Sequence, residues 1–130
     1  MNTTDILSFT ATALTMLTLD ATWLYLRNGY HQKLFKDIQG TEIKPRIVPA
    51  LLIYVILPVA VYVWAVRSST VPIEAVQNGA FVGLILYAFY DLTNYATLTA
   101  YTFQMTLTDI LWGTFLCTLG ALAGFYVKYK

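Results

Sequence analysis

The chain has 130 residues, of which 58% are hydrophobic and only 12% are charged, and its formal net charge is +1. Soluble domains carry roughly 25% charged residues, so this composition is typical of a single membrane domain over residues 1–130. The near-neutral charge balance argues against nucleic-acid binding. With one cysteine, Cys117, and one histidine, His31, the chain has no internal disulfide and no zinc-type ligand set, and we predict no metal and no cofactor.

The first expected membrane span covers residues 6–26. Residues 1–5 lack the basic segment that opens a cleavable signal peptide, so we expect the N-terminus to be retained. The apolar run that follows has the length of about 20 residues needed to cross a hydrocarbon core of roughly 30 Å. Asp20 interrupts this run, and Trp23 and Tyr25 near its exit are typical of an interfacial aromatic belt.

Residues 27–46 form the only substantial polar segment, and they are rich in Lys and Arg. By the positive-inside rule, this loop is predicted to be cytoplasmic. Within it, Tyr30, Leu34 and Ile38 recur at every fourth position, which predicts a short amphipathic helix lying on lipid head groups. A site for a phosphorylated ligand involving His31 is the alternative interpretation.

Three further spans are expected at residues 47–66, 76–99 and 107–126. Together with the first span they predict an all-α fold, an integral membrane bundle of four helices that contacts the lipid bilayer. If the loop 27–46 is cytoplasmic, an even number of spans places both termini outside. The connection between the last two spans is short and carries no charge.

Aspartates recur inside these expected spans, at Asp20, Asp91 and Asp109. An Asp at the centre of a membrane helix costs about 2.5–3.5 kcal/mol, so such residues are usually retained for a function or a specific polar contact. All three lie toward the cytoplasmic side, and we expect no Lys or Arg at that depth. Helical spacing adds further side chains to the same faces. The predicted polar site therefore comprises Asp20, Trp23, Tyr87, Asp91, Thr93, Asn94 and Asp109.

Small residues follow one face of the last span, at Gly113, Gly120 and Gly124, and they include a Gly-x-x-x-Gly pair. Such a ridge lets another helix approach closely, so we predict that these glycines are packing positions. Because four helices make a small transporter, we also expect this ridge to support a homodimer or a larger membrane complex.

The first and third spans share a short pattern. Asp20-Ala-Thr and Asp91-Leu-Thr occur at an equivalent depth, two helices apart. This pattern supports the hypothesis of two parallel helical-hairpin repeats.

Three stretches, Asp20–Leu24, Tyr90–Leu98 and Asp109–Gly113, carry a resemblance to a known family. They resemble the signature stretches of small, mostly bacterial, four-helix membrane proteins catalogued as domain of unknown function 2177. The resemblance covers nearly the whole chain and implies the same fold and the same polar residues, including Trp112, but no established activity. Family members often have an Arg-Gly-Trp-Pro-like turn after the central stretch, whereas this chain has Thr99-Ala-Tyr101-Thr102.

Three classes of function stay open from the sequence. In the first, the aspartates bind protons, cations or a small solute for transport. In the second, the protein is a structural or accessory membrane subunit in which hydrogen-bonded aspartates fix helix packing. The third is a lipid-modifying enzyme. An intramembrane aspartyl protease is not supported, because Asp109 lacks a preceding Gly-x-Gly, and we favour a protein that is not an enzyme.

Overall fold

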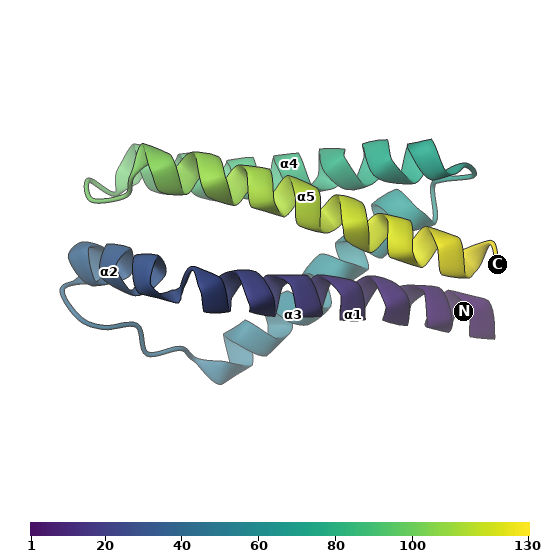
Figure 1. The fold of residues 1–130 in the computed structure, drawn as a ribbon, viewed down its shortest axis with the longest axis horizontal. Coiled ribbons are helices and arrows are strands. Elements are labelled where there is room, and N and C mark those ends of the chain that lie inside the picture. The colour runs from purple at the N-terminus through teal and green to yellow at the C-terminus, as the bar shows by residue number, and fades with distance from the viewer.

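The computed structural model describes residues 1–130, and the chain forms only helices and their connections, which confirms the all-α prediction (Figure 1). The helix boundaries follow local capping chemistry. In chain order the elements are α1 (Thr3–Leu26), α2 (Asn28–Gln39), α3 (Ile47–Val61), its π-helical continuation η1 (Tyr62–Val66), α4 (Pro72–Thr97) and α5 (Phe103–Lys128).

Polar caps and a proline set the beginnings of the long helices. At α1, the Asn2 side chain accepts a hydrogen bond from the Asp5 N–H at 2.8 Å, and Asp5 accepts one from the Asn2 N–H at 3.2 Å, which completes a capping box. At α5, the Thr102 hydroxyl accepts a single capping hydrogen bond from the Met105 N–H at 3.1 Å, and Pro72 occupies the first position of α4, where its missing N–H is harmless. These signals explain why α4 and α5 begin earlier than the expected positions 76 and 107.

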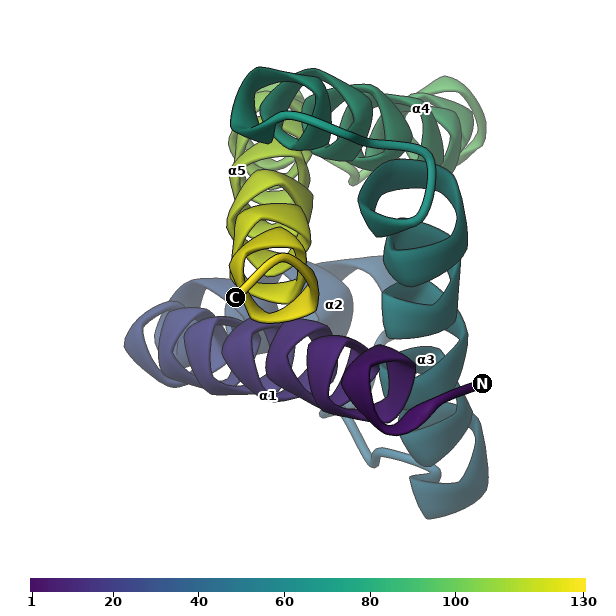
Figure 2. The ribbon, with the colours of Figure 1, turned by 90° about the vertical axis from the view of Figure 1, so that its right-hand side faces the viewer.

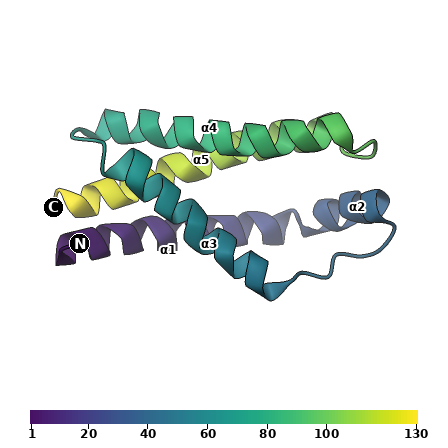
Figure 3. The same cartoon turned by 180° about the vertical axis from the view of Figure 1, so that it is seen from behind.

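α5 lies at the centre of the fold, between α4 on one side and α1 on the other (Figures 1 and 2). α4 and α5 form a close antiparallel pair joined by a short turn. α3 instead crosses obliquely, starting beyond α1 and ending beside α4 (Figure 3). The two halves of the chain are therefore packed differently, and the expected pair of parallel helical hairpins has no counterpart in this arrangement.

Glycines allow these helices to approach closely, but the contacts lie within the chain. A Cβ at Gly120 would overlap Met16 of α1, and one at Gly124 would overlap the hydroxyl of Thr12. Ser8 adds a hydrogen bond of 2.7 Å from its Oγ to the Gly124 carbonyl. The expectation that this ridge is a homodimer surface is wrong for this structure, because α1 covers Gly120 and Gly124 and Tyr87 of α4 covers Gly113.

Both termini lie at the same end of the molecule, together with the α3–α4 connection (Figure 1). Lys128 Nζ donates to the Arg67 carbonyl at 3.4 Å, and the Tyr129 hydroxyl donates to the Ser69 carbonyl at 2.9 Å. α2 and the α4–α5 turn lie at the opposite end.

Three segments are long and apolar enough to cross a membrane by length and composition, namely Ile47–Val66, Pro72–Thr97 and Phe103–Lys128. α1 is not among them, although it has 24 residues, because repeated threonines and Asp20 lower its hydropathy. The sequence-based expectation of four spans is therefore met for three of them.

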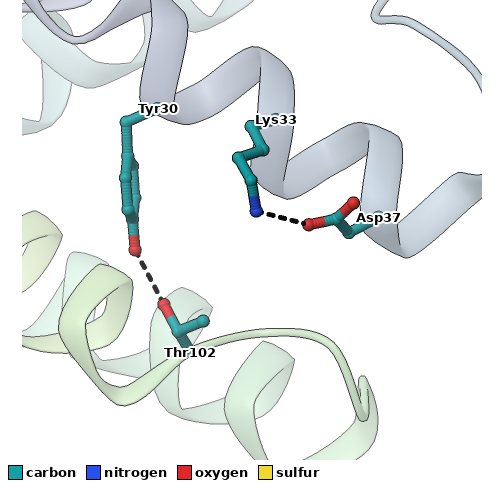
Figure 4. A network of polar contacts seen from close by, with 4 residues as sticks. All are labelled: Tyr30, Lys33, Asp37 and Thr102. Carbon is teal, nitrogen blue, oxygen red and sulfur yellow. Dashed lines mark hydrogen bonds and ion pairs between the residues drawn. The ribbon is translucent and has the colours of Figure 1, made fainter.

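α2 closes one end of the bundle. Its apolar side chain Leu34 is 5% exposed and packs against Tyr101 and Met105 of the α4–α5 turn region. The Tyr30 hydroxyl lies 2.8 Å from the Thr102 hydroxyl, and on the outer side Lys33 pairs with Asp37 at 3.2 Å (Figure 4). The helix was correctly predicted, but its apolar face packs on the chain itself instead of on lipid head groups.

Candidate functional site

Asp91 of α4 is the most deeply buried carboxyl group of the fold, with an exposed fraction of 0%. Its Oδ1 accepts a hydrogen bond of 2.5 Å from the hydroxyl of Tyr101, which lies in the α4–α5 turn and is itself 3% exposed. Its Oδ2 is buried and has no hydrogen-bond partner. A buried carboxyl oxygen without a partner costs about 1–3 kcal/mol, so this atom marks a position where a partner is missing.

Asp109, near the beginning of α5, lies beside Asp91. The two carboxyl groups are close enough to share a hydrogen bond when one of them is protonated. Two adjacent carboxylates repel each other strongly in a low-dielectric environment, so such a pair holds one proton between them. Neither residue forms an ion pair, because the ion pairs of this structure are Lys33–Asp37 and Lys36–Glu42.

Arg27, at the α1–α2 junction, brings a positive charge toward this region. Its guanidinium lies 5.2 Å from the Trp23 ring centroid and 4.4 Å from the Tyr30 ring centroid. Its Nη2 donates to the hydroxyl of Thr108 at 3.4 Å, one residue before Asp109. The expectation that no cation reaches this depth therefore needs correction, but Arg27 stays beyond ion-pair distance of the acidic pair.

Asp20 lies in a different environment. Its Oδ2 accepts a hydrogen bond of 2.9 Å from the Tyr54 hydroxyl of α3, and its Oδ1 accepts one of 3.0 Å from Trp112 Nε1 of α5. The Trp112 ring stacks on Trp23 with 4.6 Å between ring centroids and 6° between the planes. Asp20 therefore ties three helices together, and each of its carboxyl oxygens has a donor.

Of the remaining residues of the predicted site, Tyr87 and Asn94 lie near the aspartates or their hydrogen-bond partners, and Thr93 does not. The Tyr87 ring packs against Gly113 of α5, where a Cβ would overlap it, and its hydroxyl lies within electrostatic reach of Asp20 and Asp109. Asn94 lies close to the hydroxyl of Tyr101. Thr93 is exposed and donates to the Phe89 carbonyl at 2.6 Å, so the structure does not bring it to the acidic pair.

Two tyrosines that contact the aspartates were not predicted from the sequence. Tyr101 lies in the turn between α4 and α5, and no helical spacing relates it to Asp91. Tyr54 reaches Asp20 only because α3 crosses α1 at that depth. Asp91 and Asp20 therefore each accept a hydrogen bond from a tyrosine in a segment that local periodicity cannot relate to them.

A largely apolar groove of about 840 Å³ opens between α3 and α4. Ten of its eleven lining residues are hydrophobic, and the exception is Asp109. The groove therefore leads from the outer surface of these two helices to one member of the acidic pair.

The arrangement of potential metal ligands can be described directly. No group of three or more His, Cys, Asp or Glu residues is arranged to hold a metal ion. The acidic pair offers carboxyl oxygens from two residues only, with Tyr101 donating to one of them.

Comparisons with known proteins agree with the membrane character of the helices. A family model described as "Predicted membrane protein (DUF2177)" matches residues 5–126. No curated protein and no solved structure matches the chain significantly.

Proposed function

This chain belongs to the predicted membrane protein family DUF2177, and from its geometry we propose that it binds a positive charge, as a proton or a cation, at Asp91 and Asp109 and carries it within the membrane. The observation that carries this proposal is the buried Asp91 carboxyl group. One of its oxygens has no hydrogen-bond partner, and the carboxyl group as a whole lies beside that of Asp109.

Electrostatics give the reason. A pair of carboxyl groups that holds one proton has a net charge of about −1, and a buried net charge is costly unless it is paired. A second proton or a bound cation neutralises the pair. Intramembrane carboxylates without an ion-pair partner recur in proton and cation pathways.

The proposal includes α1 as a fourth membrane crossing. At 1.5 Å per residue its 24 residues extend about 36 Å, enough for a hydrocarbon core of roughly 30 Å. It lies alongside α5, and its leucines Leu7, Leu14 and Leu24 are exposed where lipid would cover them. The shared end of the two termini is also what four crossings produce, with residues 27–46 on the cytoplasmic side.

Membrane sidedness can be tested by cysteine labelling. In a Cys117→Ala background, Asn2→Cys and Lys130→Cys are expected to react from the same side of intact cells with an impermeant maleimide, and Gln39→Cys only after permeabilisation. Labelling of the two termini from opposite sides would contradict a fourth crossing.

Proton movement tests the proposed activity directly. The protein is reconstituted in liposomes containing a pH-sensitive dye, and proton uptake is driven by a potassium diffusion potential. Asp91→Asn and Asp109→Asn are expected to abolish uptake, whereas Asp37→Asn, which makes the same chemical change on the exposed face of α2, retains it. Unchanged uptake in a folded Asp91→Asn variant would overturn the proposal for protons.

A structural role is the second candidate function, and the contacts of Asp20 favour it for that residue. Both of its carboxyl oxygens accept hydrogen bonds, one from α3 and one from α5. We propose that Asp20 fixes the packing of these helices and takes no direct part in binding. Asp20→Asn should then lower thermal stability while the folded fraction still moves protons.

A further inference from the structure

The groove between α3 and α4 has one polar end. Its wall on α3 and η1 includes Ile56, Ala60 and Trp64, and its wall on α4 includes Leu86 and Tyr90. Asp109 is the lining residue that is not hydrophobic. Its volume of about 840 Å³ falls within the roughly 300–1,000 Å³ typical of small-molecule sites.

The groove faces outward between two membrane-spanning helices, whereas the aqueous end of the bundle beside Asp91 is covered. Leu34 of α2 packs over Tyr101, and Tyr101 in turn donates to Asp91. A ligand that reaches the acidic pair through the groove therefore passes between α3 and α4, from the side that faces lipid.

The charges near Asp109 indicate which kind of head group the groove can bind. No Lys or Arg lines the groove, and Arg27 is turned toward Thr108 and the rings of Trp23 and Tyr30. Asp109 lines this end and the carboxyl group of Asp91 lies beside it, so the polar end offers acceptors and negative charge, although the charge of Arg27 also acts on Asp109. An anionic head group would be repelled there, and a neutral chain would leave Asp109 without an ion-pair partner.

We propose that this groove binds a single-chain amphiphile with a positively charged head group, its chain lying between α3 and α4 and its head group paired with Asp109, beside the buried Asp91. The inference rests on the proposed function, since it uses the same acidic pair, and it adds the class of ligand and its entry from the bilayer. The apolar chain covers the hydrophobic lining of the groove, and the cation supplies an ion-pair partner for Asp109, which no Lys or Arg of the chain provides.

Trp64 provides a reporter inside the groove, because it is one of the lining residues. The protein in neutral maltoside micelles is titrated with a medium-chain bromoalkyl-trimethylammonium, whose bromine quenches a tryptophan that it contacts. We expect saturable quenching that disappears in Trp64→Phe. Tetramethylammonium, which has the head group alone, and the matching neutral bromoalkanol, which has the chain alone, should each bind at least about tenfold more weakly, or about 1.4 kcal/mol.

Two variants test separately how the charge of Asp109 and the open space of the groove contribute to binding of the probe. Asp109→Asn should weaken binding of the cationic probe about tenfold or more and leave that of the bromoalkanol unchanged. Ala60→Phe should block both by filling the groove; if this variant does not fold, Val63→Phe at a more exposed position of the same wall replaces it. Quenching that persists in Trp64→Phe, or that is equal in wild type and Asp109→Asn, would overturn the inference.

The outcomes distinguish this inference from the proposed function. If Asp91→Asn abolishes proton uptake but the probe binds Asp109→Asn as it binds wild type, the amphiphile site is wrong and proton carriage stands. If proton uptake does not depend on Asp91 but probe binding requires Asp109, proton carriage is wrong and the amphiphile site stands.

Discussion

The hydroxyl of Tyr101 donates a hydrogen bond of 2.5 Å to Asp91, so a residue of the α4–α5 turn reaches back into the preceding helix. Tyr101 is also covered by Leu34 of α2. This contact links the end of the bundle that α2 closes to the most buried carboxyl group of the fold, and it makes the stability of the acidic pair dependent on the turn.

Removing that phenol should therefore destabilise the protein. In Tyr101→Phe, both oxygens of Asp91 lack a donor from the protein, and we expect the free energy of unfolding to fall by about 1–3 kcal/mol. Thermal unfolding in detergent, followed by circular dichroism, measures this loss. Tyr25→Phe is the matched control, because Tyr25 is 83% exposed and forms no side-chain hydrogen bond; equal melting temperatures for the two variants would contradict the prediction.

The contacts of Asp20 predict coupling between α3 and α5. Tyr54→Phe and Trp112→Phe each remove one donor, and each should lower the free energy of unfolding by about 1–3 kcal/mol. A double-mutant cycle of Tyr54→Phe with Asp20→Asn should show a coupling energy of about 0.5–3 kcal/mol, because the two residues are hydrogen-bonded. Strict additivity in this cycle would argue against the hydrogen bond.

Two glycine substitutions should have opposite effects. Gly113→Ala places a Cβ against the Tyr87 ring, so we expect overpacking to lower the free energy of unfolding by about 1–3 kcal/mol. Adding Tyr87→Leu to the same chain should partly recover this stability. Gly29→Ala in α2 meets no atom within 4 Å and should be neutral or stabilise the helix by up to about 1 kcal/mol. Thermal unfolding of the three variants tests both statements, and a neutral Gly113→Ala would show that the contact is not tight.

His31 predicts a pH dependence of the α2 cap. Burial lowers the pKa of His31 below its ordinary value of 6.5, and the nearby charge of Arg27 lowers it further, against a smaller raising effect of Asp20. The unfolded chain takes up a proton at a higher pH than the folded chain does, so this contribution to stability is present above pH 6.5 and is lost as the pH falls through the lowered folded pKa.

The measurement compares wild type with His31→Gln. Between about pH 7.5 and about pH 5.5, the melting temperature of wild type should fall more than that of the variant, and amide exchange in α2 should accelerate. A parallel change in both proteins would assign the pH dependence to other groups.

The sequence was most informative where periodicity and hydropathy act locally. The expected span 47–66 coincides with α3 and η1, and the amphipathic spacing of Tyr30, Leu34 and Ile38 correctly predicts α2. The surface against which α2 packs could not be predicted in this way. An apolar stripe indicates that one face of a helix is buried, but it does not indicate which part of the chain covers that face. The same limitation applies to the glycine ridge of α5, whose spacing predicts a close helix contact without specifying that α1 and α4 make it.

By itself, the sequence determined the helical membrane character of the chain and identified Asp20, Asp91 and Asp109 as residues whose burial requires an explanation. The tertiary structure decided how they differ. Asp20 receives donors from Tyr54 and Trp112, whereas Asp91 keeps one oxygen unpartnered beside Asp109. Helical spacing fixes only which side chains share a face of one helix. The partner of a carboxyl group depends on how the other helices cross, and these crossings arise from contacts between residues far apart in the chain.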